Sequence, residues 1–111
     1  MDKAMIDVRK DIEKTIQEHD VVLFMKGTAD APMCGFSAVV VQVLQKLDAP
    51  FKAVNVLEDP AVRQGIKDFS DWPTVPQLYV KAEFIGGCDI VKEMYQTGEL
   101  ETFLREKQII A

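Results

Sequence analysis

Two kinds of hydrophobic pattern alternate along the chain, one typical of amphipathic helices and the other of buried strands. Apolar residues recur at helical spacing, with acids and bases between them, over residues 2–18. The continuous apolar run that follows, Val21–Met25, is typical of a strand that is buried on both faces. Residues 26–33 contain Gly27 and Pro32, so we expect a loop there.

The next apolar segment, residues 37–47, fits two patterns. Val39, Val40 and Val41 would pass for a strand on propensity alone, because β-branched side chains favour strands. The apolar positions of the segment also fit one face of a helix, and the sequence that follows it, residues 48–50, is typical of a helix end. We interpret the segment as a helix.

The second half of the chain predicts two more strand regions and three more helices. N-cap residues, prolines, glycines and alternating apolar positions set their expected limits. We expect a strand over 51–57, a helix from Asp59 and Pro60 to about Phe69, a hairpin of 77–81 and 83–85 with a tight turn near Ala82, a helix capped by Asp89 that runs to about Gln96, and a last helix over about 99–106 after Gly98.

This order of elements predicts the fold class. Short strands around one right-handed β-α-β unit that ends in a hairpin pack as a mixed sheet between layers of helices. We predict an α/β thioredoxin fold, in which a four-stranded mixed sheet is flanked by helices on both faces. The first two strands are expected to be parallel and the hairpin antiparallel to them. At 111 residues the chain, 1–111, is expected to form a single domain.

The composition of the chain argues against two classes of binding partner, nucleic acids and membranes. The net charge is −5, whereas binding to nucleic acid phosphates needs concentrated positive charge, so we expect no nucleic acid partner. No apolar run approaches the roughly 20 residues that cross a bilayer, and we expect no membrane association. The start of the chain lacks the apolar block of a signal peptide. Two unevenly placed cysteines favour a reducing compartment.

The strongest chemical signal is the sequence Cys34-Gly35-Phe36-Ser37. Cys34 is expected in the first turn of a helix, where free N–H groups and the helix dipole favour a thiolate, the form that attacks sulfur or binds metal. A dithiol site would have a second cysteine where Ser37 stands, so this site cannot close a local disulfide. An inert, buried cysteine is the alternative. Gly35, which leaves room for a ligand, and the polar loop before it favour a reactive or ligating thiol.

Two further segments are expected to face this thiol. Pro76 precedes a strand and is ordinary there, but a cis Val75–Pro76 bond would present the backbone of Val75 to whatever sits on Cys34. Free N–H groups at the helix start near Asp89 can hold a carboxylate, and Asp89 itself could pair with an amino group. Cys88 is expected to be half-buried rather than catalytic, and its cross-linking to Cys34 under oxidation stays open.

Basic residues are the remaining candidates in this acidic chain. Lys26 ends the first strand on the side of Cys34, and Arg63, in the first turn of a helix, could grip a carboxylate bidentately. We expect Lys67 to be ordinary surface and His19, the only histidine, to be inert. Two cysteines and one histidine do not make a closed four-ligand zinc site.

Four motifs together resemble those of the monothiol (CGFS-type) glutaredoxins, in the same order and at the same spacing. The resemblance runs from about residue 16 to 104, and residues 63–70 resemble the mitochondrial and α-proteobacterial branch. The motifs are Met25-Lys26-Gly27-Thr28, Cys34-Gly35-Phe36-Ser37, Trp72-Pro73-Thr74-Val75-Pro76-Gln77 and Gly86-Gly87-Cys88-Asp89-Ile90.

The resemblance implies two ligands, glutathione and a [2Fe–2S] cluster. Two chains would share the cluster as a homodimer, each giving Cys34 and one bound glutathione, because four thiolates are the usual ligand set. The implied glutathione contacts are Val75 for the cysteinyl part, Cys88 N–H and Asp89 for the γ-glutamyl end, and Lys26 and Arg63 for the glycine carboxylate, with Phe36, Pro76 and Gly87 also in the site.

The resemblance favours an iron–sulfur carrier that receives a cluster from assembly machinery and passes it to apo-proteins or to a BolA-like partner. The alternative is an enzyme that reduces protein–glutathione mixed disulfides through Cys34. A regulatory module that only senses glutathione or binds partners is a third hypothesis without positive support. We expect the cytoplasm of a bacterium as the compartment, with the mitochondrial matrix as the alternative.

Overall fold

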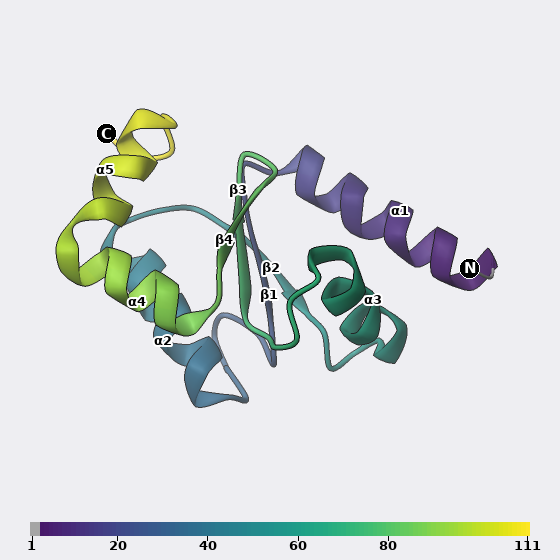
Figure 1. Cartoon of the computed structure of the whole chain (residues 1–111). Helices are drawn as coiled ribbons and strands as arrows, with labels where there is room; N and C mark the ends of the chain where they lie inside the picture. Colours follow the sequence, from purple (N-terminus) through teal and green to yellow (C-terminus); the bar gives the residue numbers. More distant parts are fainter. Residues whose placement is uncertain (1–2) are drawn as a thin grey trace.

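The computed structural model describes residues 3–111, with side chains from residue 6 onward, and shows one sheet between two layers of helices (Figure 1). The predicted first helix includes residue 2, which lies outside the described residues. No helix within the described range has both the length and the apolar character needed to cross a membrane. In chain order the elements are α1 (Lys3–Glu18), β1 (Val21–Met25), α2 (Gly35–Lys46), β2 (Lys52–Asn55), α3 (Pro60–Ser70), β3 (Gln77–Val80), β4 (Glu83–Gly86), α4 (Cys88–Thr97) and α5 (Glu99–Glu106).

The sheet has the strand order β2-β1-β3-β4. β1 and β2 are parallel, with Leu23 opposite Ala53, and β3 is antiparallel to β1, with Leu23 opposite Leu78. β4 returns antiparallel to β3. The predicted thioredoxin fold and its mixed four-stranded sheet are therefore confirmed, as is the helical interpretation of residues 37–47.

The two faces of β1 belong to two separate hydrophobic cores. Leu23 and Met25 pack with residues of α2, α4 and α5, whereas Val22 and Phe24 pack with residues of α1 and α3. Figure 1 shows the same division, with α2 and α4 on one side of the sheet and α1 and α3 on the other. All five residues of β1 are buried, which confirms the prediction from their continuous apolar run.

β2 is shorter than the predicted strand 51–57 because the chain turns out of the sheet after Asn55. The Oδ1 atom of Asn55 accepts hydrogen bonds from the backbone N–H groups of Gly27 and Leu57, both at 3.0 Å. These bonds connect the end of β2 with the loop that follows β1. The same side chain therefore ends the strand and fixes a segment close to the thiol.

Of the two aspartates predicted as helix N-caps, the structure confirms one and contradicts the other. Asp59 is the N-cap of α3, since its carboxylate accepts the N–H of Ala61 at 3.0 Å. The prediction that Asp89 caps α4 is wrong: the N-cap is Gly87, whose carbonyl oxygen accepts the N–H of Val91 at 3.0 Å. Asp89 lies instead in the first turn, where its negative charge still suits the helix dipole.

Candidate functional site

Cys34 is the N-cap residue of α2, one position before the first helical residue. Its backbone is extended, with φ −149° and ψ 134°, and its carbonyl oxygen accepts the N–H of Ala38 at 2.9 Å. The side chain is half-buried. The sequence predicted Cys34 in the first turn of the helix; the structure places it one position earlier, directly before the free N–H groups of that turn.

The start of α2 lowers the pKa of the Cys34 thiol below its ordinary value. The backbone N–H of Ser37 is the largest cause, and the N–H of Phe36 and the positive charge of Lys26 act in the same direction, against the effect of partial burial. The thiol makes no capping hydrogen bond of standard geometry, so these groups act on it as nearby positive dipoles. The thiolate fraction at neutral pH is therefore larger than that of free cysteine.

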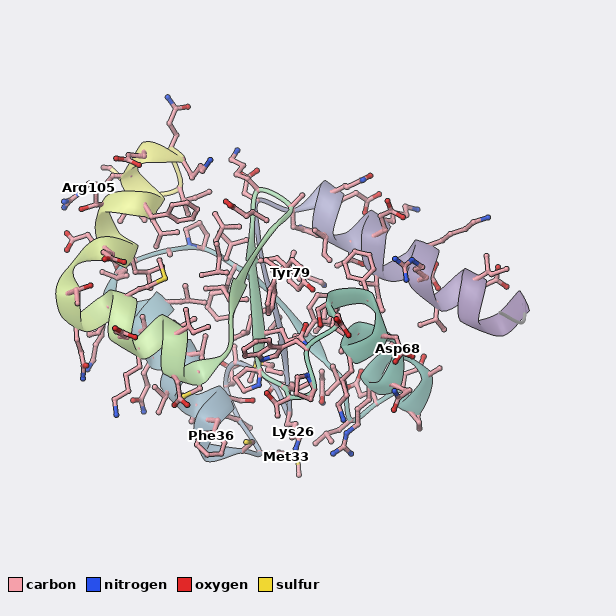
Figure 2. The ribbon with its side chains drawn as sticks, viewed as in Figure 1. Lys26, Met33, Phe36, Asp68, Tyr79 and Arg105 are labelled. Atoms are coloured by element: carbon pink, nitrogen blue, oxygen red, sulfur yellow. The ribbon has the colours of Figure 1, made fainter. Side chains whose placement is uncertain are left out.

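Hydrogen bonds fix the loop that carries Cys34 to the end of β1. The N–H of Lys26 donates to the fully buried hydroxyl of Ser37 at 3.1 Å, and the N–H of Met33 donates to the carbonyl oxygen of Lys26 at 2.9 Å. Figure 2 shows the side chains of Lys26, Met33 and Phe36 at the same end of the molecule. Ser37 stands at the position where a dithiol site would have its second cysteine. Here its hydroxyl instead connects the start of α2 with the residue that follows β1.

A groove of about 250 Å³ lies between the start of α2, the loop before β3 and the start of α4. Cys34 is not itself part of the lining, but Phe36, two positions after it, is. The Val75–Pro76 bond in the groove wall is cis, as the sharper of the two sequence hypotheses expected. The lining residues are Phe36, Trp72, Thr74, Val75, Gly87, Cys88, Asp89 and Ile90.

Cys88 differs from Cys34 in its chemistry. Burial raises the pKa of the Cys88 thiol, and the nearby charges of Asp89 and Cys34 raise it further, whereas Lys92 lowers it. Its side chain is half-buried, as the sequence predicted. Of the two thiols, Cys34 is therefore the more readily ionised one.

Close packing around position 87 favours a glycine there. A Cβ atom there would lie 3.3 Å from the carbonyl oxygen of Pro76 and 3.4 Å from Nε1 of Trp72. Pro76 itself is buried behind the groove wall and does not line it. The loop before β3 and the start of α4 therefore meet at Gly87.

The structure brings most of the predicted site residues together. Phe36, Val75, Gly87, Cys88 and Asp89 line one groove, and Lys26 acts on the pKa of Cys34 beside it. Arg63 lies half-buried on α3 and is not part of the groove lining.

Sequence reasoning left several site residues out of the candidate set. Trp72, Thr74 and Ile90 also line the groove. All three stand within or next to motifs that contain predicted site residues, and that adjacency was the available signal. Met33, directly before the thiol, is 72% exposed, and Phe36 is 63% exposed. Two large apolar side chains close to Cys34 in the sequence are therefore in contact with solvent.

We expect iodoacetamide to alkylate Cys34 faster than Cys88 at neutral pH. A lowered pKa gives Cys34 more thiolate at a given pH than free cysteine has, and a raised pKa gives Cys88 less. Alkylation rates measured from pH 6 to 10 by peptide mass mapping should therefore show a midpoint below that of free cysteine for Cys34 and above it for Cys88. Coincident midpoints would contradict the electrostatic description of the site.

The described part of the chain contains no group of three or more His, Cys, Asp or Glu side chains that could hold a metal ion. One readily ionised thiol beside a groove can act as a nucleophile toward sulfur or donate a single ligand to a metal. A metal centre with three or more ligands at Cys34 would therefore need groups other than the described side chains.

Comparison with known proteins gives consistent matches. The glutaredoxin family model matches residues 21–85. The chain is 55% identical over 98 residues to probable monothiol glutaredoxin 2 of Rickettsia typhi, with 88% of each chain covered. It is 50% identical over 103 residues to the chloroplastic monothiol glutaredoxin-S7 of rice, which covers 93% of this chain and 61% of that longer protein. The solution structure of reduced apo GrxS14 from poplar is similar, with 50% identity, a TM-score of 0.83 and coverage of 95% of this chain and 97% of that one.

Proposed function

Since this chain belongs to the glutaredoxin family, in its monothiol branch, we propose that it binds glutathione beside Cys34 and carries a [2Fe–2S] cluster between two copies of itself. The observation that carries this proposal is a readily ionised thiol close to a groove, with no cluster of three or more metal-ligating side chains among the described residues. A chain with this site can contribute to a cluster but cannot complete one.

The groove has the chemistry to hold a small peptide with charged ends. The start of α4 offers free N–H groups to the γ-glutamyl carboxylate, and the carboxylate of Asp89 suits the amino group of the same end. The backbone of Val75 lines the middle of the groove and would pair with the cysteinyl part of glutathione. Lys26, beside Cys34, would pair with the glycine carboxylate, and so would Arg63 after a turn of its side chain toward the groove.

Ligand count and surface character support a shared cluster. A [2Fe–2S] cluster takes four thiolate ligands, and two chains with two glutathione molecules supply four. Met33 and Phe36 stand exposed on either side of the thiol, so they would be covered when two copies meet at Cys34. Ligands held without covalent bonds to the chain exchange readily, and this suits cargo that is passed on to apo-proteins or to a BolA-like partner.

The compartment follows from the same proposal. A site filled by free glutathione needs a compartment that keeps thiols reduced. Since the relatives include a Rickettsia protein, we propose the bacterial cytoplasm first and the mitochondrial matrix second.

Anaerobic reconstitution tests the proposed function. We expect the wild-type protein with ferrous iron, sulfide and glutathione to develop visible absorption and to elute as a dimer, with one cluster per two chains. The same mixture without glutathione is the control and should stay colourless and monomeric. A protein that binds cluster equally well without glutathione, or that stays colourless with it, would refute the carrier proposal.

One observation also favours the alternative function of an oxidoreductase: the lowered pKa of Cys34 supplies a nucleophilic thiolate. This thiolate would attack the glutathione sulfur of a mixed disulfide, release the protein thiol and leave a Cys34–glutathione disulfide. A second glutathione would then free Cys34 as its thiol and leave as glutathione disulfide. Rapid turnover of a glutathionylated peptide by a protein that never develops colour would favour this enzyme over the carrier.

A further inference from the structure

Gln77, the first residue of β3, is a fully buried polar side chain in a hydrophobic setting. Its amide nitrogen Nε2 donates to the carbonyl oxygens of Thr74 at 3.0 Å and Trp72 at 3.3 Å. Its Oε1 accepts the hydroxyl of Tyr79 at 3.3 Å. A buried amide is costly unless its donors and acceptor are used, and this one has both N–H groups and its oxygen engaged.

The two carbonyl groups that Gln77 holds belong to the wall of the groove. Trp72 and Thr74 line the groove, and Val75 follows them directly. The Gln77 side chain lies behind this wall and is not itself part of the lining. We propose that Gln77 is a positioning residue, which fixes the wall formed by residues 72–75 so that it is shaped for its ligand before the ligand arrives. This inference rests on the proposed glutathione site.

The two backbone carbonyl oxygens fix the orientation of the amide, and Tyr79 uses the oxygen that remains. Carbonyl oxygens only accept hydrogen bonds, so the NH₂ group must face Trp72 and Thr74, and Oε1 is left to accept the hydroxyl of Tyr79. An amide flipped by half a turn would put an oxygen against two carbonyl oxygens. Tyr79 is buried between the sheet and α3 (Figure 2), and its ring packs against Phe69 with 6.3 Å between the ring centroids. Burial raises the pKa of Tyr79 to about 12, so its hydroxyl keeps the proton that it donates.

Residues 72–75 include a natural fluorescent probe of their own environment, since Trp72 is the only tryptophan in the chain. Its ring packs against Phe84 with 5.8 Å between the ring centroids. Its indole Nε1 is buried and has no hydrogen-bond partner in the described part of the molecule. While the hydrogen bonds of Gln77 hold residues 72–75 in place, this N–H is shielded from water. Without these bonds the N–H would become exposed to water. Tryptophan emission therefore reports on Gln77 independently of any ligand.

The test compares Gln77→Met with the wild-type full chain. Methionine keeps the length and apolar volume of the side chain and removes all three hydrogen bonds. We expect a red shift of Trp72 emission, greater quenching by acrylamide, and glutathione affinity about tenfold lower by calorimetric titration. Tyr79→Phe removes only the bond to Oε1 and should change both readouts in the same direction by less. Leu104→Ala, in the core on the other face of the sheet, is the control for lost stability and should leave the emission wavelength unchanged.

Two outcomes would overturn the inference. Wild-type emission in a folded Gln77→Met variant would show that the wall does not depend on the amide, and so would an equal red shift in Leu104→Ala. If Gln77→Met fails to fold, Tyr79→Phe decides, and unchanged emission and affinity in that variant would refute the role of Gln77. A wild-type protein that binds no glutathione would refute the proposed function instead, and the emission result would still decide whether Gln77 holds the wall.

Discussion

Replacement of Cys34 by serine should leave the protein colourless after reconstitution with iron, sulfide and glutathione, whereas Cys88→Ser should keep the visible absorption. Iron–sulfur clusters are bound through thiolates, and a serine hydroxyl does not ionise near neutral pH. We expect that Cys88 does not replace Cys34 as a ligand, because burial and a neighbouring carboxylate raise its pKa and make its thiolate harder to form. The measurement is the visible spectrum together with the iron and sulfide content per chain.

The Cys34→Ser variant should be no less stable than the wild type, so its loss of colour can be read as loss of a ligand. Cys34 occupies the N-cap of α2 without a capping hydrogen bond of standard geometry. Serine is among the preferred N-cap residues, and its hydroxyl is expected to add up to about 1 kcal/mol to the free energy of unfolding. Urea denaturation of both proteins provides the control.

Retention of the cluster in Cys34→Ser, together with its loss in Cys88→Ser, would identify Cys88 as the ligand. The proposed site would then be wrong in its central residue. Loss of colour in both single variants would indicate that both thiols of a chain are ligands, and the proposed ligand set of one cysteine and one glutathione per chain would then be wrong. Only the asymmetric result, with Cys34 essential and Cys88 dispensable, agrees with the proposed function.

Much of the fold follows from local patterns that the sequence displays. The buried strand Val21–Met25 is recognisable because all its side chains are apolar, and the parallel pair follows from the helix between the first two strands. The limits of elements are less predictable, because they depend on contacts between distant residues. The strand expected over 51–57 ends at Asn55, whose side chain holds Gly27, 28 positions earlier in the chain.

The place of the thiol at a helix start, and the two segments around Val75 and Asp89, could be predicted from residues that are adjacent in the sequence. The prediction for Asp89 was wrong because N-cap preference favours aspartate, whereas Gly87, two residues earlier, meets the loop before β3 and takes the cap position. Gln77 ends one of the four motifs, but a polar residue at the start of a strand is ordinary, so its position in the motif does not indicate what its side chain does. Only its contacts with Trp72, Thr74 and Tyr79 in three dimensions reveal it.

Replacement of Gly27 by alanine should lower the free energy of unfolding by about 2–5 kcal/mol, as the sum of two costs. Gly27 has φ +91°, in the left-handed region of backbone conformation. Any residue with a Cβ atom loses about 1–2 kcal/mol of stability in that region. A Cβ atom would also lie 2.6 Å from both the carbonyl oxygen of Ala31 and the backbone nitrogen of Met33, an overlap with backbone that costs about 1–3 kcal/mol more. Thermal unfolding measures the total, with a shift of roughly 4 °C per kcal/mol.

Alanine substitutions at two other glycines distinguish the backbone cost from the cost of steric overlap. Gly98 has φ +85° and open space around it, so Gly98→Ala should show the backbone cost of about 1–2 kcal/mol alone. Gly35, at the start of α2, has neither constraint, and Gly35→Ala should be neutral or stabilising by up to about 1 kcal/mol.

The same overlap should also change the reactivity of Cys34. To relieve it, the Gly27→Ala loop must move Met33 away from Lys26, whose carbonyl oxygen it binds at 2.9 Å, and Cys34 follows Met33 directly. The sulfur then leaves the N–H groups and the lysine charge that lower its pKa. The alkylation midpoint of Cys34 should therefore rise toward that of free cysteine in Gly27→Ala and stay unchanged in Gly98→Ala. A destabilised Gly27→Ala protein with a wild-type midpoint would show that this loop does not determine the position of the thiol.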